Sequence, residues 1–128
     1  MNQAQSLLLD GLTKTRHVAN AALVRAADAS VLASTPGFPV QSLAPQLVRA
    51  FYKDLLQVRR EGMYFKERHY ACVRADEHAI YLKGEDSGVV LAKTKAFVLV
   101  GTYAQGMHPS VCVEAVEKLA EYLRKKGN

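Results

Sequence analysis

Histidine and cysteine are the residues of this chain that could ligate a metal or act as a nucleophile. The chain contains four histidines, His17, His69, His78 and His108. No two of them are four residues apart, which is the spacing of a metal-binding pair on one helix. The two cysteines, Cys72 and Cys112, fall on a predicted strand and on the apolar side of a predicted helix, where a free cysteine acts as a small hydrophobic residue. We therefore predict no metal site, no disulfide and a reducing compartment.

Motifs for nucleotide binding or covalent catalysis cannot be recognised either. The glycine-bearing segments at 62, 84–88 and 101–106 do not continue into the Lys-Ser/Thr pair of a phosphate-binding loop. No nucleophile elbow and no pair of catalytic carboxylates can be singled out. The sequence thus predicts a protein that is not an enzyme and has no cofactor, so its function must depend on binding.

The composition indicates a soluble domain with acidic partners. The chain has 128 residues, of which 49% are apolar, which is enough for one domain around a single core. Its net charge of +5 favours acidic partners, but the aromatic residues do not alternate with basic ones as in a base-stacking surface, so nucleic acid is not expected. No apolar run approaches the roughly 20 residues of a membrane span, and the N-terminal region lacks the form of a secretory signal, so a cytoplasmic protein is predicted.

The segment 88–123 predicts the elements that must position any binding surface. Residues 89–92 and 96–100 are apolar runs separated by a short polar turn, which predicts a buried antiparallel hairpin. Pro109 then marks the first turn of a helix. Cys112, Val116 and Leu119 follow at helical spacing, so one side of this helix is expected to lie on the sheet.

The rest of the chain predicts two more helices and further strands. The predicted ranges are a helix at 6–13, strands at 17–25 and 31–34, a helix at 42–56, and strands at 63–65, 70–74, 79–83, 88–94 and 96–103. Sequential antiparallel strands with helices at both ends of the chain define an α+β domain.

Several of these segments resemble the profilins, small proteins that bind actin monomers and polyproline. The matching segments are AALVRAADASVLASTPGF, KERHYACVRADEHAIYLKGEDSGVVLAKT, KTKAFVLVGTYAQGM and VEKLAEYL. The resemblance covers nearly the whole chain and implies a profilin-like seven-stranded antiparallel sheet, with the N- and C-terminal helices on one face and the middle helix on the other. RREGMYFKERHYACVRADE and YLRKKG look most like a divergent vertebrate isoform, which implies a role in male germ cells.

The resemblance places a polyproline site between the terminal helices, where profilins present aromatic rings to the ligand. Gln5, Leu8 and Leu32 align with the usual aromatic positions, and the chain has no tryptophan. Tyr122, beside Leu123, is the aromatic residue that remains. We expect polyproline binding to be weak or absent, with Leu8 and Leu32 packing in the core.

The resemblance places an actin-binding face on the central strands and the start of the last helix. The corresponding residues are His69, Ala71, Val73, Arg74, Lys83, Met107, His108, Val113, Glu114 and Lys118. Glu114 stands where the common vertebrate isoforms have a lysine, and Lys118 where they have an acid. Because like charges that meet across an interface oppose binding, we expect actin binding to be weak or absent.

Exposed basic residues indicate a third surface, for anionic phospholipids such as phosphoinositides and phosphatidic acid. The candidate residues are Lys14, Arg16, Arg59, Arg60, Lys66, Arg68, Arg124, Lys125 and Lys126. Near an anionic membrane, each Lys or Arg contributes about 1 kcal/mol.

The sequence thus predicts a monomeric, cytoskeleton-associated binding protein that has kept lipid binding. One alternative is an ordinary profilin that binds actin monomers and regulates polymerisation. Another is an adaptor for an unknown protein, which would bind through exposed Phe51, Tyr52 or Tyr122.

Overall fold

The computed structural model describes residues 3–128, and its elements follow the predicted order with an additional helix in the middle. The helices are α1 (Gln3–Gly11), the short 3-10 helix η1 (Thr13–Thr15), α2 (Ala44–Tyr52), α3 (Leu55–Glu61) and α4 (Pro109–Lys125). The strands are β1 (Asn20–Arg25), β2 (Val31–Ser34), β3 (Met63–Phe65), β4 (Arg68–Ala75), β5 (Ala79–Lys83), β6 (Gly88–Lys93) and β7 (Phe97–Tyr103).

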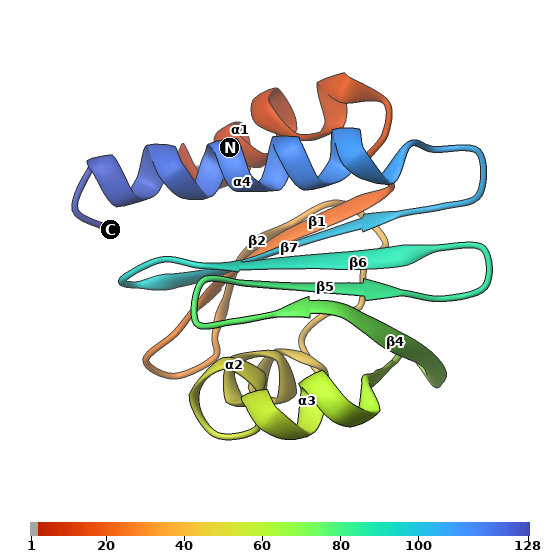
Figure 1. The fold of residues 1–128 in the computed structure, drawn as a ribbon. Helices are drawn as coiled ribbons and strands as arrows, with labels where there is room; N and C mark the ends of the chain where they lie inside the picture. Colours follow the sequence, from red (N-terminus) through yellow and green to blue (C-terminus); the bar gives the residue numbers. More distant parts are fainter. Residues whose placement is uncertain (1–2) are drawn as a thin grey trace.

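The strands form one seven-stranded antiparallel sheet in the order β2-β1-β7-β6-β5-β4-β3 (Figure 1). From β7 to β3 each strand pairs with the strand next to it in the chain. β1 pairs with β7, with Leu23 opposite Leu99. The first and the last strand of the chain are therefore neighbours inside the sheet. β6 is buried along almost its whole length because helices cover both faces of the sheet, which explains its continuous apolar sequence.

The helices form two layers, with α1 and α4 on one face of the sheet and α2 and α3 on the other (Figure 1). This arrangement confirms the predicted profilin fold. α4 buries Cys112, Val116 and Leu119 against the sheet, as their helical spacing predicts. Gly101 of β7 lies below this stripe, where a Cβ atom would stand 2.5 Å from Cγ2 of Val116. The absence of a side chain at Gly101 therefore sets how closely α4 approaches the sheet.

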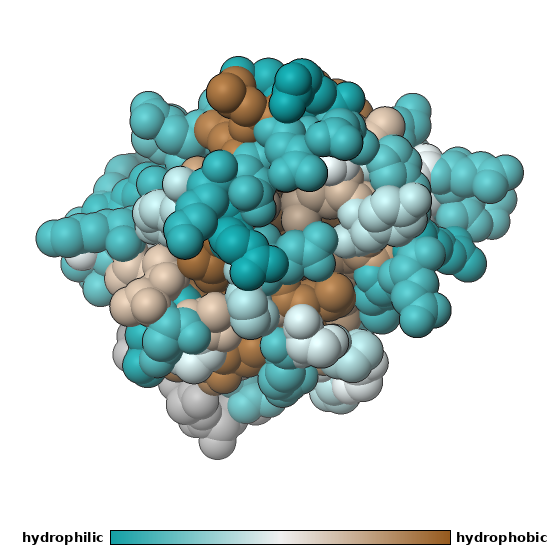
Figure 2. All heavy atoms as spheres, turned by 90° about the horizontal axis from the view of Figure 1, so that it is seen from below, coloured by the Kyte–Doolittle hydropathy of each residue, from teal (hydrophilic) through white to brown (hydrophobic). Residues whose placement is uncertain are grey.

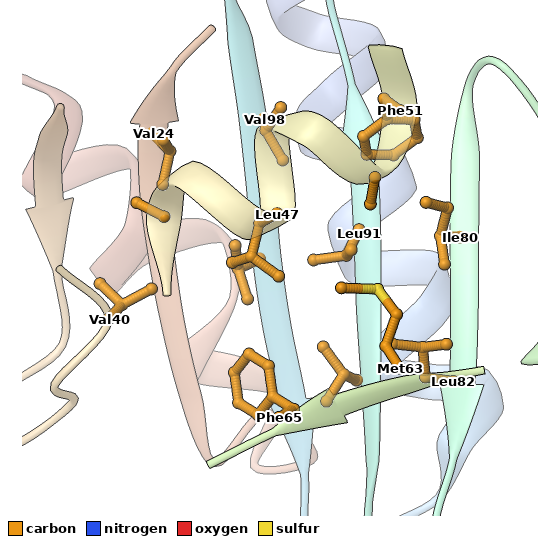
Figure 3. Packing of buried hydrophobic residues seen from close by; sticks show 14 of the residues in the cluster. Val24, Val40, Leu47, Phe51, Met63, Phe65, Ile80, Leu82, Leu91 and Val98 are labelled. Carbon is orange, nitrogen blue, oxygen red and sulfur yellow. The ribbon is translucent and has the colours of Figure 1, made fainter. Parts of the chain in front are cut away.

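The sheet separates two groups of buried side chains. On the α2 and α3 side, Leu47 and Phe51 of α2 point toward the sheet and pack over Leu91 (Figure 3). On the α1 and α4 side, Leu8 and Leu12 pack with the buried stripe of α4. Each layer of helices thus has its own core.

The prediction of one middle helix at 42–56 is wrong. The segment forms two helices, α2 and α3, with a short interruption between them. The backbone N–H groups of Lys53 and Asp54 both donate to the carbonyl of Arg49, which ends α2. Asp54, a residue that favours helix starts, precedes α3. Neither Gly nor Pro marks this break, so the apolar spacing of residues 47–55 indicated a continuous helix.

The start of the chain also differs from the prediction. α1 occupies residues 3–11 instead of 6–13, and the first strand begins at Asn20 instead of His17. Arg16 adopts a left-handed conformation with φ of 65°, and the N–H of His17 donates to Oγ1 of Thr15. This turn delays the entry into β1 by three residues.

Candidate functional site

A hollow of about 360 Å³ lies between α1 and α4, at the place where the resemblance locates the polyproline site. The residues that line it are Ala4, Leu7, Leu23, Phe97, Tyr122, Leu123, Lys126 and Asn128. The wall of this hollow is mainly aliphatic, with Tyr122 and Phe97 as its aromatic members. It can accept an apolar ligand, but it offers few flat rings.

Leu8, which the resemblance aligns with an aromatic position of the polyproline site, does not line this hollow. Leu8 is 2% exposed and belongs to the core, whereas Ala4 and Leu7, one helical residue before Gln5 and Leu8, line the hollow. Because each residue turns an α-helix by about 100°, an alignment shifted by one residue exchanges a groove position for a core position. The expectation that Leu8 packs in the core is confirmed.

The other predicted residues of this surface are spread between core and solvent. Tyr122 is 41% exposed, and the ammonium of Lys126 stands 5.5 Å from its ring centroid. Leu123 is buried, and Leu32 is half-buried against the α1–α4 core, as expected for a packing residue. Gln5 is half-buried.

The predicted actin face is exposed along β4. His69, Ala71 and Val73 alternate with inward residues, and Val73 is 66% exposed. The register between β4 and β5 shifts between Cys72 and Arg74, so that Val73 and Arg74 both reach solvent. Lys83 is also exposed.

A polar network joins this face to α4. Arg74 donates through Nε to Oδ2 of Asp76 at 2.8 Å and through Nη1 to the hydroxyl of Tyr81 at 3.0 Å. The Tyr81 hydroxyl donates to Oε2 of Glu117 at 2.6 Å. Burial, together with this hydrogen bond to Glu117, raises the pKa of Tyr81 to about 12. The guanidinium of Arg74 thus has three partners within the protein, although its side chain is exposed.

Sequence analysis did not identify Tyr81, Asp76 or Glu117 as part of this face. Tyr81 reaches Arg74 because β5 pairs with β4, and Glu117 reaches both because α4 docks on the sheet. No local spacing in the sequence indicates such a contact between distant elements.

The start of α4 carries the remaining residues of the actin face. Glu114 and Lys118 form an ion pair with Oε1 and Nζ 2.9 Å apart, and this contact raises the pKa of Lys118. The backbone N–H of His108 donates to Nδ1 of His17, and the centroids of the two imidazole rings lie 4.9 Å apart with the ring planes tilted by 39°. Met107 and Val113 are half-buried beside them.

The predicted basic residues are all exposed, but they lie on several parts of the molecule. Lys14 and Arg16 belong to η1 and its end, and Arg59 and Arg60 to α3. Lys66 belongs to the β3–β4 turn, and Arg68 begins β4. Arg124, Lys125 and Lys126 lie at the end of α4. Some of these cations already have partners: Arg59 donates to the carbonyl of Ala75, and Arg68 pairs with Asp86.

The end of α4 lies beside the β6–β7 turn, which brings together cations that the sequence did not group. Nη2 of Arg124 donates to the carbonyl of Lys93 at 2.7 Å. Lys95, in the same turn, is exposed and has no ionic partner in residues 3–128. The ammonium of Lys93 itself lies over the ring of Tyr52. We call Lys95 and the run 124–126 the C-terminal basic cluster.

The thiols are not arranged for catalysis. Burial raises the pKa of Cys112 to about 12, and burial also raises that of Cys72, so both thiols strongly favour the protonated form. Within residues 3–128, no group of three or more His, Cys, Asp and Glu side chains comes together as a metal site would require. Over the same part of the chain, no helix is both long and apolar enough to cross a bilayer.

The fold and its exposed faces define a binding protein of the profilin class. The family model for profilin matches residues 2–128. The chain belongs to the profilin family, whose members are cytoskeleton-associated actin-binding proteins and not enzymes.

Individual relatives agree with the predicted likeness to a divergent vertebrate isoform. Profilin-4 of Bos taurus is 52% identical over 129 residues, covering 100% of both chains. The solved structure of Acanthamoeba castellanii profilin IB has a TM-score of 0.89 and 33% identity, covering 98% of this chain and 100% of that one. Mouse profilin IIa, solved in complex with a double repeat from the FH1 domain of mDia1, has a TM-score of 0.72 and 22% identity, with 98% and 96% of the two chains covered.

Proposed function

We propose that this protein is a cytoskeleton-associated profilin whose main retained activity is binding to anionic phospholipids, with weak or absent binding of actin and polyproline. The C-terminal basic cluster is the observation that carries this proposal. Its cations extend from a helix end and a neighbouring turn, and within residues 3–128 the nearby acid Glu121 forms an ion pair with Lys125 alone. A role in male germ cells, implied by the resemblance to the divergent isoform, belongs to the same proposal.

The aliphatic lining of the α1–α4 hollow supports weak polyproline binding. Aromatic anchors at interfaces commonly contribute about 1 to 2 kcal/mol each. Ala4, Leu7 and Leu32 provide no aromatic ring on this side. Three missing rings would weaken binding by roughly 3 kcal/mol or more.

The internal pairing of charges supports weak actin binding. Arg74 is engaged by Asp76, Tyr81 and Glu117. Lys118 is engaged by Glu114. A partner that needs these cations must first displace their internal partners, in addition to meeting a reversed charge pattern on α4.

Vesicle co-sedimentation tests the lipid proposal. The protein should sediment with vesicles that contain phosphatidic acid or a phosphoinositide, and not with neutral phosphatidylcholine. Replacing Lys95, Lys125 and Lys126 with Gln should weaken binding by about 3 kcal/mol, since each cation near the membrane contributes about 1 kcal/mol. Raising the salt concentration to 1 M should release the protein, because the screening length falls to about 3 Å.

The matched control removes the same charge elsewhere, with Lys53→Gln, Lys83→Gln and Lys118→Gln, none of which is a candidate lipid-binding residue. These residues are exposed and lie outside the C-terminal basic cluster. The control should lose much less affinity than the cluster variant. Equal losses would show that only net charge matters, and equal binding to neutral vesicles would contradict the proposal itself.

Pyrene-actin polymerisation tests the actin face. A several-fold excess of the unmodified protein should leave spontaneous polymerisation almost unchanged. The double exchange Glu114→Lys/Lys118→Glu should slow it, because the exchange restores the usual charge pattern and keeps an ion pair on α4. Strong slowing by the unmodified protein would instead support the alternative of an ordinary actin-monomer-binding profilin.

A further inference from the structure

A second groove lies on the opposite face of the molecule from the α1–α4 hollow. One wall is the outer side of α2, which presents Pro45, Val48 and Tyr52 at helical spacing. The other wall is the β1–β2 turn at 26–29, and Ala96 of the β6–β7 turn also lines the groove. The groove has a volume of about 710 Å³, within the range of about 300 to 1,000 Å³ that ligand sites occupy.

The floor of this groove is apolar and firmly placed. Val48 and Ala29 are half-buried and pack against the α2–α3 core. Ala29 adopts a left-handed conformation with φ of 60°, and its N–H donates to the carbonyl of Arg25. Asp28 accepts hydrogen bonds from the N–H and the hydroxyl of Ser30, which closes the turn. These hydrogen bonds fix the conformation of the turn, so that its alanine side chains line the groove.

An exposed aromatic ring stands at the edge of the groove. Tyr52 is 51% exposed, and the ammonium of Lys93 lies 4.7 Å from its ring centroid. Phe51, the other aromatic residue considered for an adaptor surface, is buried on the sheet side of α2, so that expectation is wrong for Phe51. In Figure 2, which shows this face of the molecule, pale brown side chains lie at the left edge among teal polar ones.

The rim of the groove is strongly basic. Its lining contains four cationic side chains and a single carboxylate: Arg25, Arg49, Lys53, Lys95 and Asp28. Asp28 is already paired with Arg25 at 3.3 Å. Lys53 and Lys95 have no ionic partner anywhere in residues 3–128. A ligand that covers this apolar floor must therefore meet unbalanced positive charge around it.

We propose that this groove is a docking site for an acidic peptide segment of a partner protein, with apolar side chains on its floor and carboxylates at Lys53 and Lys95. In an extended segment, alternate side chains point to opposite sides. A segment in which apolar and acidic residues alternate can therefore place its apolar side chains on the floor of the groove and its carboxylates beside the cations of the rim. A flat anionic membrane would meet the cations but would leave the recessed floor uncovered. The site goes beyond lipid binding and does not depend on it.

The test uses a fluorescently labelled synthetic peptide in which Glu and Leu alternate, measured by fluorescence anisotropy. The unmodified protein should bind it, and versions with Gln for Glu or Ser for Leu should bind several-fold more weakly. The variant Lys53→Glu/Lys95→Glu should lose about ten-fold or more, because each reversal replaces an attraction with a repulsion. The matched control Lys14→Glu/Lys83→Glu has the same net charge and should change binding about two-fold at most.

A second variant separates docking in the groove from attraction to charge alone. Tyr52→Ala removes an exposed ring without opening the core, so it should keep the unfolding midpoint and lose peptide affinity several-fold. Backbone amide shifts in an NMR titration should concentrate at 26–29, 46–53 and 95–96. Equal effects of the two charge variants, or no effect of Tyr52→Ala, would overturn the proposal. Failure of the peptide to bind while Lys53→Glu alone abolishes vesicle binding would assign the face to lipid instead, because Lys53 lies outside the C-terminal basic cluster.

Discussion

Poly-L-proline resin should retain the triple variant Ala4→Trp/Leu7→Tyr/Leu32→Trp and should let the unmodified protein pass. Ala4 and Leu7 line the hollow beside Tyr122, and Leu32 is half-buried next to the same core. Three rings at about 1 to 2 kcal/mol each would strengthen binding by about 3 to 6 kcal/mol, which is a hundred-fold or more. Retention on the resin and tryptophan fluorescence during titration with poly-L-proline both measure the gain.

The matched control is Leu8→Tyr, which places the ring one residue further along α1. Leu8 is 2% exposed, so a larger and polar side chain must either overpack the core or push α1 away from it. Overpacking typically costs about 1 to 3 kcal/mol, whereas Leu7→Tyr points into the hollow and should leave stability nearly unchanged. If the triple variant folds and still does not bind, the hollow differs from a polyproline groove in shape as well as in side chains.

Gly62→Ala should be among the most destabilising single substitutions that add only a methyl group. Gly62 joins α3 to β3 with φ of 73° and ψ of −158°, a region that only glycine occupies readily. A Cβ atom there would stand 2.1 Å from the carbonyl oxygen of Tyr70, so the backbone of β4 would have to move. Backbone strain alone costs about 1 to 3 kcal/mol, and the clash adds to it. Chemical denaturation should show a loss of about 3 kcal/mol or more.

Gly106→Ala is the matched control for Gly62→Ala. Gly106 also has a positive φ, of 90°, but an added Cβ would have no neighbour within 4 Å. This substitution should cost only the conformational strain, about 1 to 2 kcal/mol. Similar losses of stability for the two variants would show that β4 can move away from the methyl group added at Gly62 at little cost in free energy.

The sequence allowed the fold to be predicted because its apolar periodicities and the family resemblance agree. Cys112, Val116 and Leu119 indicated the buried side of α4, and that side faces the sheet. The break between α2 and α3 escaped prediction because it depends on two N–H groups that converge on the carbonyl of Arg49, without Gly or Pro nearby.

The candidate sites were harder to predict from the sequence than the fold was. The groove beside Tyr52 combines a turn at 26–29 with a helix face and the β6–β7 turn, and only the folded chain brings these together. Nothing in the unbroken run of leucines in α1 marks that Leu7 lines the hollow while Leu8 packs in the core. The pairing of Arg74 with Tyr81 depends on strand register and could not be read from spacing.

Because the sheet separates the two groups of buried side chains, mutations on its two sides should affect stability independently. Leu8 belongs to one core, whereas Gly62 joins two elements packed on the other, so substitutions at the two sites share no packing partners. Their effects on the free energy of unfolding should therefore add to within about 0.5 kcal/mol. Mutations that remodel the α1–α4 hollow can then accumulate without disturbing the groove beside α2. One ligand surface can be lost over generations while the surface on the other side of the sheet remains under independent selection.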